Sequence, residues 1–185
     1  MAQHRFARNL LGSLAILATL SGIAYGLPAI DRALPADRPV TAGEPYQVGA
    51  GVTVIPPPHA MIDVTKTRPG QDRGTALFIL DSVRFVIVVV PFGGTLDEAA
   101  VRLRRKITDT TGYQVAGNER RVATAEGVTG RQGSYTAPGR AGRYAVFVVD
   151  GLAVEVTLSG SGTRFDAALA PVTASMRSIS FRRPE

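Results

Sequence analysis

The sequence RYAVFVVDGLAVEVTL, residues 143–158, carries the strongest local signal in the chain, because it encodes two strands and the turn between them. β-Branched and aromatic residues fill positions 143–149 and 152–158. Asp150-Gly151 lies between them and predicts a two-residue hairpin turn, since both residues tolerate positive φ. The alternation in the second strand predicts one buried face (Leu152, Val154, Val156, Leu158) and one wet face (Ala153, Glu155, Thr157).

Further strands are predicted on both sides of this hairpin. Short apolar runs bounded by turn residues favour strands at 51–55, 76–80 and 82–90, with weaker signals at 114–117, 122–125, 128–136 and 178–182. The sequence FVIVVV, residues 85–90, is apolar at every position. We therefore expect this strand to be central and covered on both faces.

Two amphipathic helices interrupt the strands. Thr95 and Glu98 form a capping-box pattern ahead of the first helix, which Gly112 is expected to end. Its apolar stripe is Leu96, Ala99, Ala100, Leu103 and Ile107. Thr163 and Asp166 repeat the pattern ahead of the second helix, where Pro171 predicts a kink or a restart. The stripe of this helix is Phe165, Ala168, Leu169, Val172 and Met176.

These elements predict one α+β domain over residues 46–185. Its core is a mainly antiparallel sheet of six to eight strands covered by two helices. With 45% hydrophobic residues among 185, the chain can bury a sizeable core, and no repeat or low-complexity segment is present.

The residues before this domain favour a membrane anchor. Residues 10–30 carry no charge and are long enough to cross a bilayer as a helix. They follow a basic tail at 1–9, with Arg5 and Arg8, and precede a Pro- and Gly-rich linker at 31–45. The alternative is a signal peptide cleaved near Ala24-Tyr25-Gly26. A retained signal anchor is favoured because the apolar run exceeds an ordinary signal-peptide core of about 7–15 residues.

Four stretches carry a resemblance to a known family: GVTVIPPPHAMIDV (51–64), GTLDEAAVRLRRKI (94–107), AVFVVDGLAVEVTLSG (145–160) and ALAPVTASMRSISF (168–181). They resemble small actinobacterial envelope proteins with a Mog1/PsbP-like domain, the LpqN-type lipoproteins among them. This chain has His59-Ala60-Met61 where that pattern has Gly-Trp, and it lacks a lipobox cysteine. The resemblance implies a binding or adaptor domain without a known reaction.

The residues show no catalytic or metal-binding signature. The chain has no cysteine, so disulfides, thiolate zinc sites and cysteine nucleophiles are excluded. Neither a nucleophile elbow nor a dinucleotide fingerprint is present, and no cofactor is expected. His59 is the one imidazole of the predicted domain, and a small hydrolase or isomerase using His59 remains an alternative.

Basic residues supply the candidate binding site. The net charge is +6, and basic side chains cluster on the solvent side of the first helix and just beyond it. The candidate residues for a protein or anionic lipid partner are Arg102, Arg104, Arg105, Lys106, Arg120 and Arg121. Without interleaved aromatic residues, nucleic acid is not expected.

We therefore expect a membrane-anchored, non-enzymatic binding or accessory module of the cell envelope. Its C-terminal domain would lie outside the cytoplasm and engage a membrane protein or a lipid. The alternative within the binding class is a secreted module that holds an apolar or lipidic ligand between helix and sheet, lined by residues 85–90.

Overall fold

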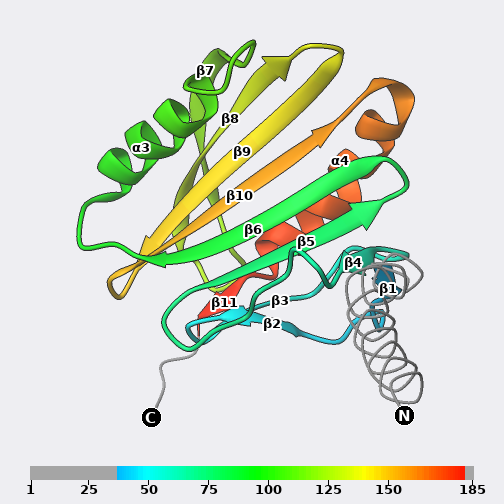
Figure 1. Cartoon of the computed structure of the whole chain (residues 1–185). Coiled ribbons are helices and arrows are strands. Elements are labelled where there is room, and N and C mark those ends of the chain that lie inside the picture. The colour runs from blue at the N-terminus through cyan, green and yellow to red at the C-terminus, as the bar shows by residue number, and fades with distance from the viewer. Residues whose placement is uncertain (1–36, 182–185) are drawn as a thin grey trace, which may run out of the picture. The chain divides into compact units, whose positions relative to one another are not determined.

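The structure, a computed structural model, describes residues 37–181. Its main element is an eight-stranded antiparallel sheet in the order β1-β4-β5-β6-β10-β9-β8-β7 (Figure 1). The strands are β1 (Asp37–Pro39), β4 (Met61–Asp63), β5 (Gly74–Leu80), β6 (Val83–Pro91), β7 (Gln114–Ala123), β8 (Thr129–Ala137), β9 (Arg140–Val149) and β10 (Leu152–Gly160). The predicted α+β class with a large antiparallel sheet is confirmed.

The hairpin between β9 and β10 forms as predicted. Asp150 and Gly151 have φ of 48° and 76°, and Val149 pairs directly with Leu152. A two-residue turn with both φ values positive matches the right-handed twist of the strands that it joins. The turn thereby sets the register of β9 and β10, two inner strands of the sheet.

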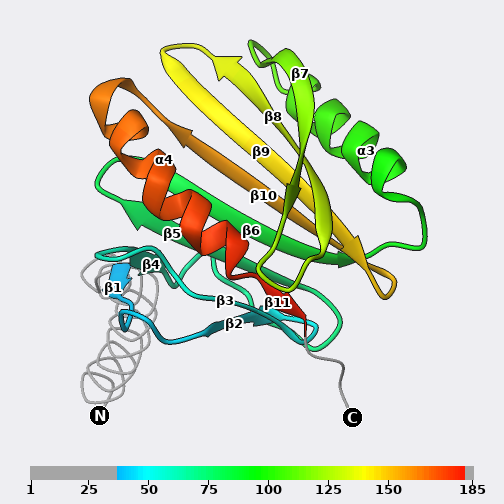
Figure 2. The same ribbon diagram turned by 180° about the vertical axis from the view of Figure 1, so that it is seen from behind.

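The two helices lie on opposite faces of the sheet. Helix α3 (Leu96–Thr108) packs on Tyr144 and Val146 of β9. Helix α4 (Gly162–Arg177) packs in the core that contains Ala145 and Phe147 of the same strand. Neighbouring residues of a strand point to opposite faces. Figure 2 shows α4 in front of the sheet, and the reverse view in Figure 1 shows it behind β5 and β6.

A small sheet completes the cover on the α4 side. Its strands are β2 (Tyr46–Gly49), β3 (Val52–Val54) and β11 (Ser180–Phe181), in the order β11-β3-β2. Val48, Val52 and Val54 are buried with Phe78 and Phe85 of the main sheet. The larger core therefore lies between the main sheet on one side and α4 with the small sheet on the other.

The helix boundaries agree with the sequence analysis only in part. The capping box of Thr95 and Glu98 is present and the apolar stripes of both helices pack inward, but α3 ends at Thr108, before Gly112. Helix α4 starts at Gly162, so Thr163 is not its cap. The helix continues through Pro171 without a restart, because buried apolar residues stabilise the helical turns before and after the proline.

Some strands differ from the prediction. The weak signals at 114–117 and 122–125 belong to one strand, β7, which has an irregular register between Ala116 and Arg120. Strands β2 and β4 were not predicted, and β1 lies inside the predicted linker, so the folded unit starts at Asp37. These strands of three or four residues are too short to show an apolar period, and pairing with neighbours creates them.

The burial of two central strands was predicted wrongly. Ala153 and Glu155 on the expected wet face of β10 are 1% and 5% exposed. In β6, by contrast, Phe85, Ile87 and Val89 are buried, whereas Val86, Val88 and Val90 are only half-buried. The sequence shows how apolar each strand is. Which strand is buried on this face depends on where α3 packs on the sheet.

The predicted basic tail, the anchor and the first part of the linker lie outside the described residues. Within residues 37–181 no helix is long and apolar enough to cross a membrane.

Candidate functional site

Half of one sheet face has no helix on it. Helix α3 buries its apolar stripe on β8 and β9, against Tyr135, Tyr144 and Val146. On the same face, β5 and β6 carry half-buried side chains that no helix of the described residues covers. We call these the uncovered strip: Thr75, Ile79, Val86, Val88 and Val90. Leu77 shares this face between Thr75 and Ile79 but is itself buried.

A buried carboxylate borders this strip. Glu155 pairs directly with Val88 across β10 and β6, and its side chain is 6% exposed. Its Oε2 lies 2.6 Å from Lys106 Nζ, and its Oε1 lies 3.6 Å from an Arg102 nitrogen. A buried carboxylate costs free energy unless it is paired, and Arg102 and Lys106 supply the pairing here. The sequence analysis did not identify Glu155 as a site residue. Two features pointed to it: Glu155 lies between two valines of a strand, and Arg102 and Lys106 are four residues apart on the predicted helix.

Arg102 also contacts an aromatic ring. Its guanidinium carbon lies 5.3 Å from the ring centroid of Phe92, in the loop before α3. Cations are attracted to the face of such a ring. Arg102 and Lys106 therefore turn toward the sheet rather than straight into solvent, although their side chains are 40% and 50% exposed.

A groove of about 540 Å³ runs along the outer side of α3. Its lining residues are Asp97, Glu98, Val101, Arg102, Arg105, Lys106 and Asp109. Asp97 binds Arg131 at 2.7 Å, and Glu98 is held by the capping box. Arg105 is exposed and has no ion pair within residues 37–181. Arg105 and Asp109, which is likewise exposed and without an ion pair in that range, are the charges of the groove that remain open to a partner.

Arg104 points away from this groove. Its Nε lies 3.6 Å from Glu119 Oε1, and the same oxygen accepts a 2.8 Å hydrogen bond from the Tyr144 hydroxyl. Burial raises the pKa of Tyr144 well above its ordinary value, and the hydrogen bond and negative charge of Glu119 raise it further. This cluster ties α3 to β7 and β9.

Arg120 and Arg121 lie on opposite faces of the sheet. Arg121 pairs with Arg131 on the α3 face, and Arg120 pairs with Gln132, whose amide contacts Met176 of α4. The six basic residues of the sequence analysis therefore do not form one patch. Arg102, Arg105 and Lys106 share the groove, and the other three lie elsewhere.

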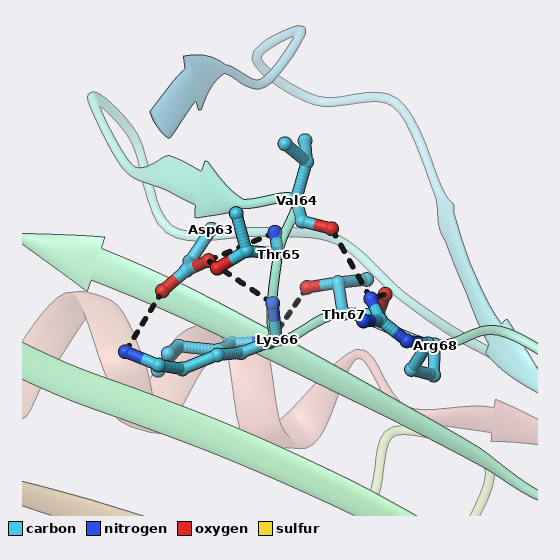
Figure 3. Close-up of polar contacts among 7 residues, drawn as sticks. Asp63, Val64, Thr65, Lys66, Thr67 and Arg68 are labelled. Atoms are coloured by element: carbon cyan, nitrogen blue, oxygen red, sulfur yellow. Dashed lines mark hydrogen bonds and ion pairs between the residues drawn. The ribbon is translucent and has the colours of Figure 1, made fainter. Parts of the chain in front are cut away.

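The loop that follows β4 lies beside β5, on the side away from β6 (Figure 3). Asp63 Oδ1 accepts hydrogen bonds from the Thr65 hydroxyl at 2.6 Å and from two backbone amides of Thr65 and Lys66 at 3.0 and 3.1 Å. Burial raises the pKa of Asp63, but the hydrogen bonds from Thr65 and Lys66 together outweigh it and hold the pKa below its ordinary value. This network fixes the loop rather than forming a reactive site.

His59 does not form a catalytic arrangement. It is exposed in a turn with φ of 61°, and within residues 37–181 it has no hydrogen bond or ion pair. No group of three or more His, Cys, Asp or Glu side chains in that range could hold a metal ion. No carboxylate of the described residues forms an ion pair with His59.

The space between α4 and the sheet is small. The hollow there measures about 20 Å³ and is lined by residues of α4 and of strands β8 to β10, Leu158, Leu169 and Val172 among them. A single water needs about 10–15 Å³ by this kind of measure. A lipid held between helix and sheet, as the secreted-module alternative supposed, would have to push the packed side chains apart.

Comparison with known proteins adds one likeness. No family model matches the sequence, and no match is found among curated proteins. The fold is similar to the solution structure of cyanobacterial PsbP (CyanoP) from Synechocystis sp. PCC 6803, with a TM-score of 0.43 and 14% identity, over 79% of this chain and 81% of that one. The actinobacterial origin and the LpqN type in the resemblance stay predictions.

Proposed function

We propose that this chain is a membrane-anchored, non-enzymatic binding module of the bacterial cell envelope. Its folded domain engages a membrane protein through the uncovered strip and the neighbouring groove of α3. The observation that carries the proposal is the half-buried valine row of β6, which lies near the centre of an eight-stranded sheet.

The strip has the composition of an interaction surface. Strands with apolar residues on both faces ordinarily lie under cover on both. Contiguous apolar side chains left open beside polar residues mark contact sites in many proteins. Here Val86, Val88 and Val90 meet water in part, and Lys106 of α3 contacts Glu155, the cross-strand partner of Val88.

Charge favours a protein partner with acidic side chains around an apolar patch. Glu155 offsets part of the charge of Arg102 and Lys106, and Arg105 keeps a full charge in the groove. Charged residues at the edge of an interface speed association and orient the two partners, whereas the apolar centre supplies most of the affinity.

The anchoring and the location rest on the sequence. The uncharged run at 10–30 supports a membrane segment, and Arg5 and Arg8 before it support a cytoplasmic N-terminus. The resemblance to actinobacterial envelope proteins supports the same compartment. C-terminal fusions to alkaline phosphatase and to a fluorescent protein test this. Active phosphatase in the membrane fraction is expected. Release of a shortened chain or a fluorescent, phosphatase-inactive result would contradict it.

Site-specific photo-crosslinking tests the contact surface in cells. A photoreactive phenylalanine analogue replaces Val88 in the full-length chain, and Ala170, an exposed residue of α4 on the opposite face, is the matched control. We expect a protein adduct of defined mass from position 88 and none from position 170. The adduct should weaken at least severalfold when Arg105→Glu is added, because the reversed charge repels an acidic rim.

Three outcomes would overturn the proposal. Equal adducts at positions 88 and 170 would mean non-specific capture. Adducts to lipid alone at position 88 would make the strip a lipid surface. A protein adduct that is insensitive to Arg105→Glu would remove the groove from the contact.

A further inference from the structure

A second basic site lies on the α4 face of the sheet, away from the proposed contact surface. A polar hollow of about 230 Å³ opens there over strands β7, β8 and β9. Its lining residues are Asn118, Arg120, Gln132, Gly133, Ser134 and Arg143. Among residues 37–181, two arginines line it and no carboxylate does.

The strand register brings these arginines to the same side. Arg120 of β7 pairs with Gln132, and Arg143 of β9 pairs with Ser134. Gln132 and Ser134 are two residues apart on β8, so their side chains share a face. The two arginines thus approach the middle strand from its two neighbours. Two strand spacings across the sheet and a two-residue offset along it separate their backbones by about 12 Å, which two arginine side chains can span with an anion between them.

Arg120 is held in place by the sheet. Its Nε donates a 2.8 Å hydrogen bond to Gln132 Oε1, and Gln132 Nε2 contacts Met176 Sδ at 3.8 Å. The irregular register of β7 falls immediately before Arg120 and includes Gly117, with φ of 70°. Such bulges redirect side chains, here Asn118, and they occur often beside functional sites.

Arg143 is the less usual residue. It is half-buried, and within residues 37–181 its guanidinium has neither a hydrogen bond nor an ion pair. The nearest acid in the sequence to Arg120 is Glu119, which turns to the other face to meet Arg104 and Tyr144. The hollow therefore keeps two positive charges that the described protein does not neutralise.

We propose that this hollow binds a phosphoryl group. Arginine presents planar pairs of donors that match phosphate oxygens, and charged hydrogen bonds of this kind are among the strongest in proteins. The Ser134 hydroxyl and the Asn118 amide, which also line the hollow, add further donors. The volume accommodates a tetrahedral anion with part of an organic stem. The inference is independent of the proposed function, because it uses the opposite face.

Phosphate binding to the full-length chain in a mild neutral detergent tests the site. The probe is inorganic phosphate against chloride at equal ionic strength, followed by the unfolding midpoint and by ³¹P line broadening. We expect saturable stabilisation of the unmodified chain, since a ligand that binds only the folded state raises the midpoint. Arg143→Gln and Arg120→Gln should each weaken binding at least tenfold.

Arg121→Gln is the matched control. It removes the same charge from the residue next to Arg120, but on the opposite face. It should bind phosphate like the unmodified chain. If the unmodified chain shows no saturable effect, or if Arg121→Gln loses as much affinity as the other two variants, the site does not exist. Unfolding midpoints without phosphate verify that each variant is folded.

A second probe identifies the source of the phosphoryl group. A short-chain phosphatidic acid, kept below its micelle-forming concentration, is titrated in the same way. Affinity at least tenfold above that of inorganic phosphate, and dependent on Arg143, would indicate a lipid headgroup. Equal or weaker affinity would indicate a soluble phosphorylated compound. Both results require the arginine dependence that the proposal predicts.

Discussion

The ring of Tyr144 lies directly over Gly133, its cross-strand partner on the face that α3 covers. A Cβ atom at position 133 would collide with the outer part of this ring. Tyr135 covers Gly142 in the same way two pairs further along β8 and β9. The two tyrosines thus fill the spaces that the two glycines leave, and α3 packs on the rings.

Gly133→Ala should therefore destabilise the fold. The added methyl group forces the Tyr144 ring to move under α3, and overpacking of this kind costs about 1–3 kcal/mol. Urea unfolding of the full-length chain in a mild detergent measures the change. Gly93→Ala is the control, because a Cβ there meets nothing within 4 Å, and it should leave the free energy of unfolding unchanged or slightly raised. Equal effects of the two variants would contradict the packing described.

The raised pKa of Tyr144 makes stability depend on pH in the alkaline range. The unfolded chain releases this phenolic proton near its ordinary pKa of about 10, whereas the folded chain keeps it. The stabilising contribution is therefore complete below about pH 10 and is lost as the pH rises toward the folded pKa. Tyr144→Phe should flatten the fall in the free energy of unfolding above pH 10. An unchanged slope would show that Tyr144 titrates normally.

The Lys106–Glu155 pair predicts unequal effects of removing its two partners. Lys106→Met leaves the buried carboxylate with Arg102 alone, so it should cost about 1–3 kcal/mol. Glu155→Gln leaves two cations that are half exposed and can be hydrated, so it should cost less. Arg105→Met, one residue away and without an ion pair in the described part of the chain, should change stability by at most about 0.5 kcal/mol. The reverse order for the first two variants would show that Glu155 is not buried as described.

Asp63 predicts a loss of stability in acid. Its pKa is below the ordinary value in the folded chain, so its stabilising contribution is complete above the unfolded pKa of about 4. This contribution is lost as the pH falls through the lower folded pKa. Asp63→Asn keeps an oxygen that accepts from the Thr65 and Lys66 amides but cannot titrate. The free energy of unfolding of the variant should decrease less steeply than that of the unmodified chain as the pH falls from about 4 to 2. If the two chains lose stability identically in acid, titratable groups other than Asp63 cause the loss.

Local signals in the sequence predicted most of the elements. The Asp150-Gly151 turn, the Thr95–Glu98 capping box and both helix stripes are short-range patterns, and all three are found in the structure. The missed strands β1, β2 and β4 have three or four residues each. They exist through backbone pairing with partners distant in the sequence, which local propensity does not encode.

The candidate site was less accessible from the sequence. The basic residues of α3 and β7 were found as a cluster, but their distribution over two faces follows from strand register. Arg143 was predicted only as the first residue of a strand, and the structure places it within β9, beside the same hollow as Arg120. Glu155 looked solvent-exposed and is buried beneath two cations of α3.

Turn chemistry and apolar periodicity act within a few residues, so the α+β class, the central hairpin and the apolar faces of the two helices can be read from local sequence. The placement of α3 and α4 on opposite faces, with α3 over β8 and β9 but not over β6, is visible only in the folded chain. Those positions depend on contacts between segments far apart in the chain. As a result, the all-apolar strand β6 keeps one side open, while the charged side chain in β10 is enclosed.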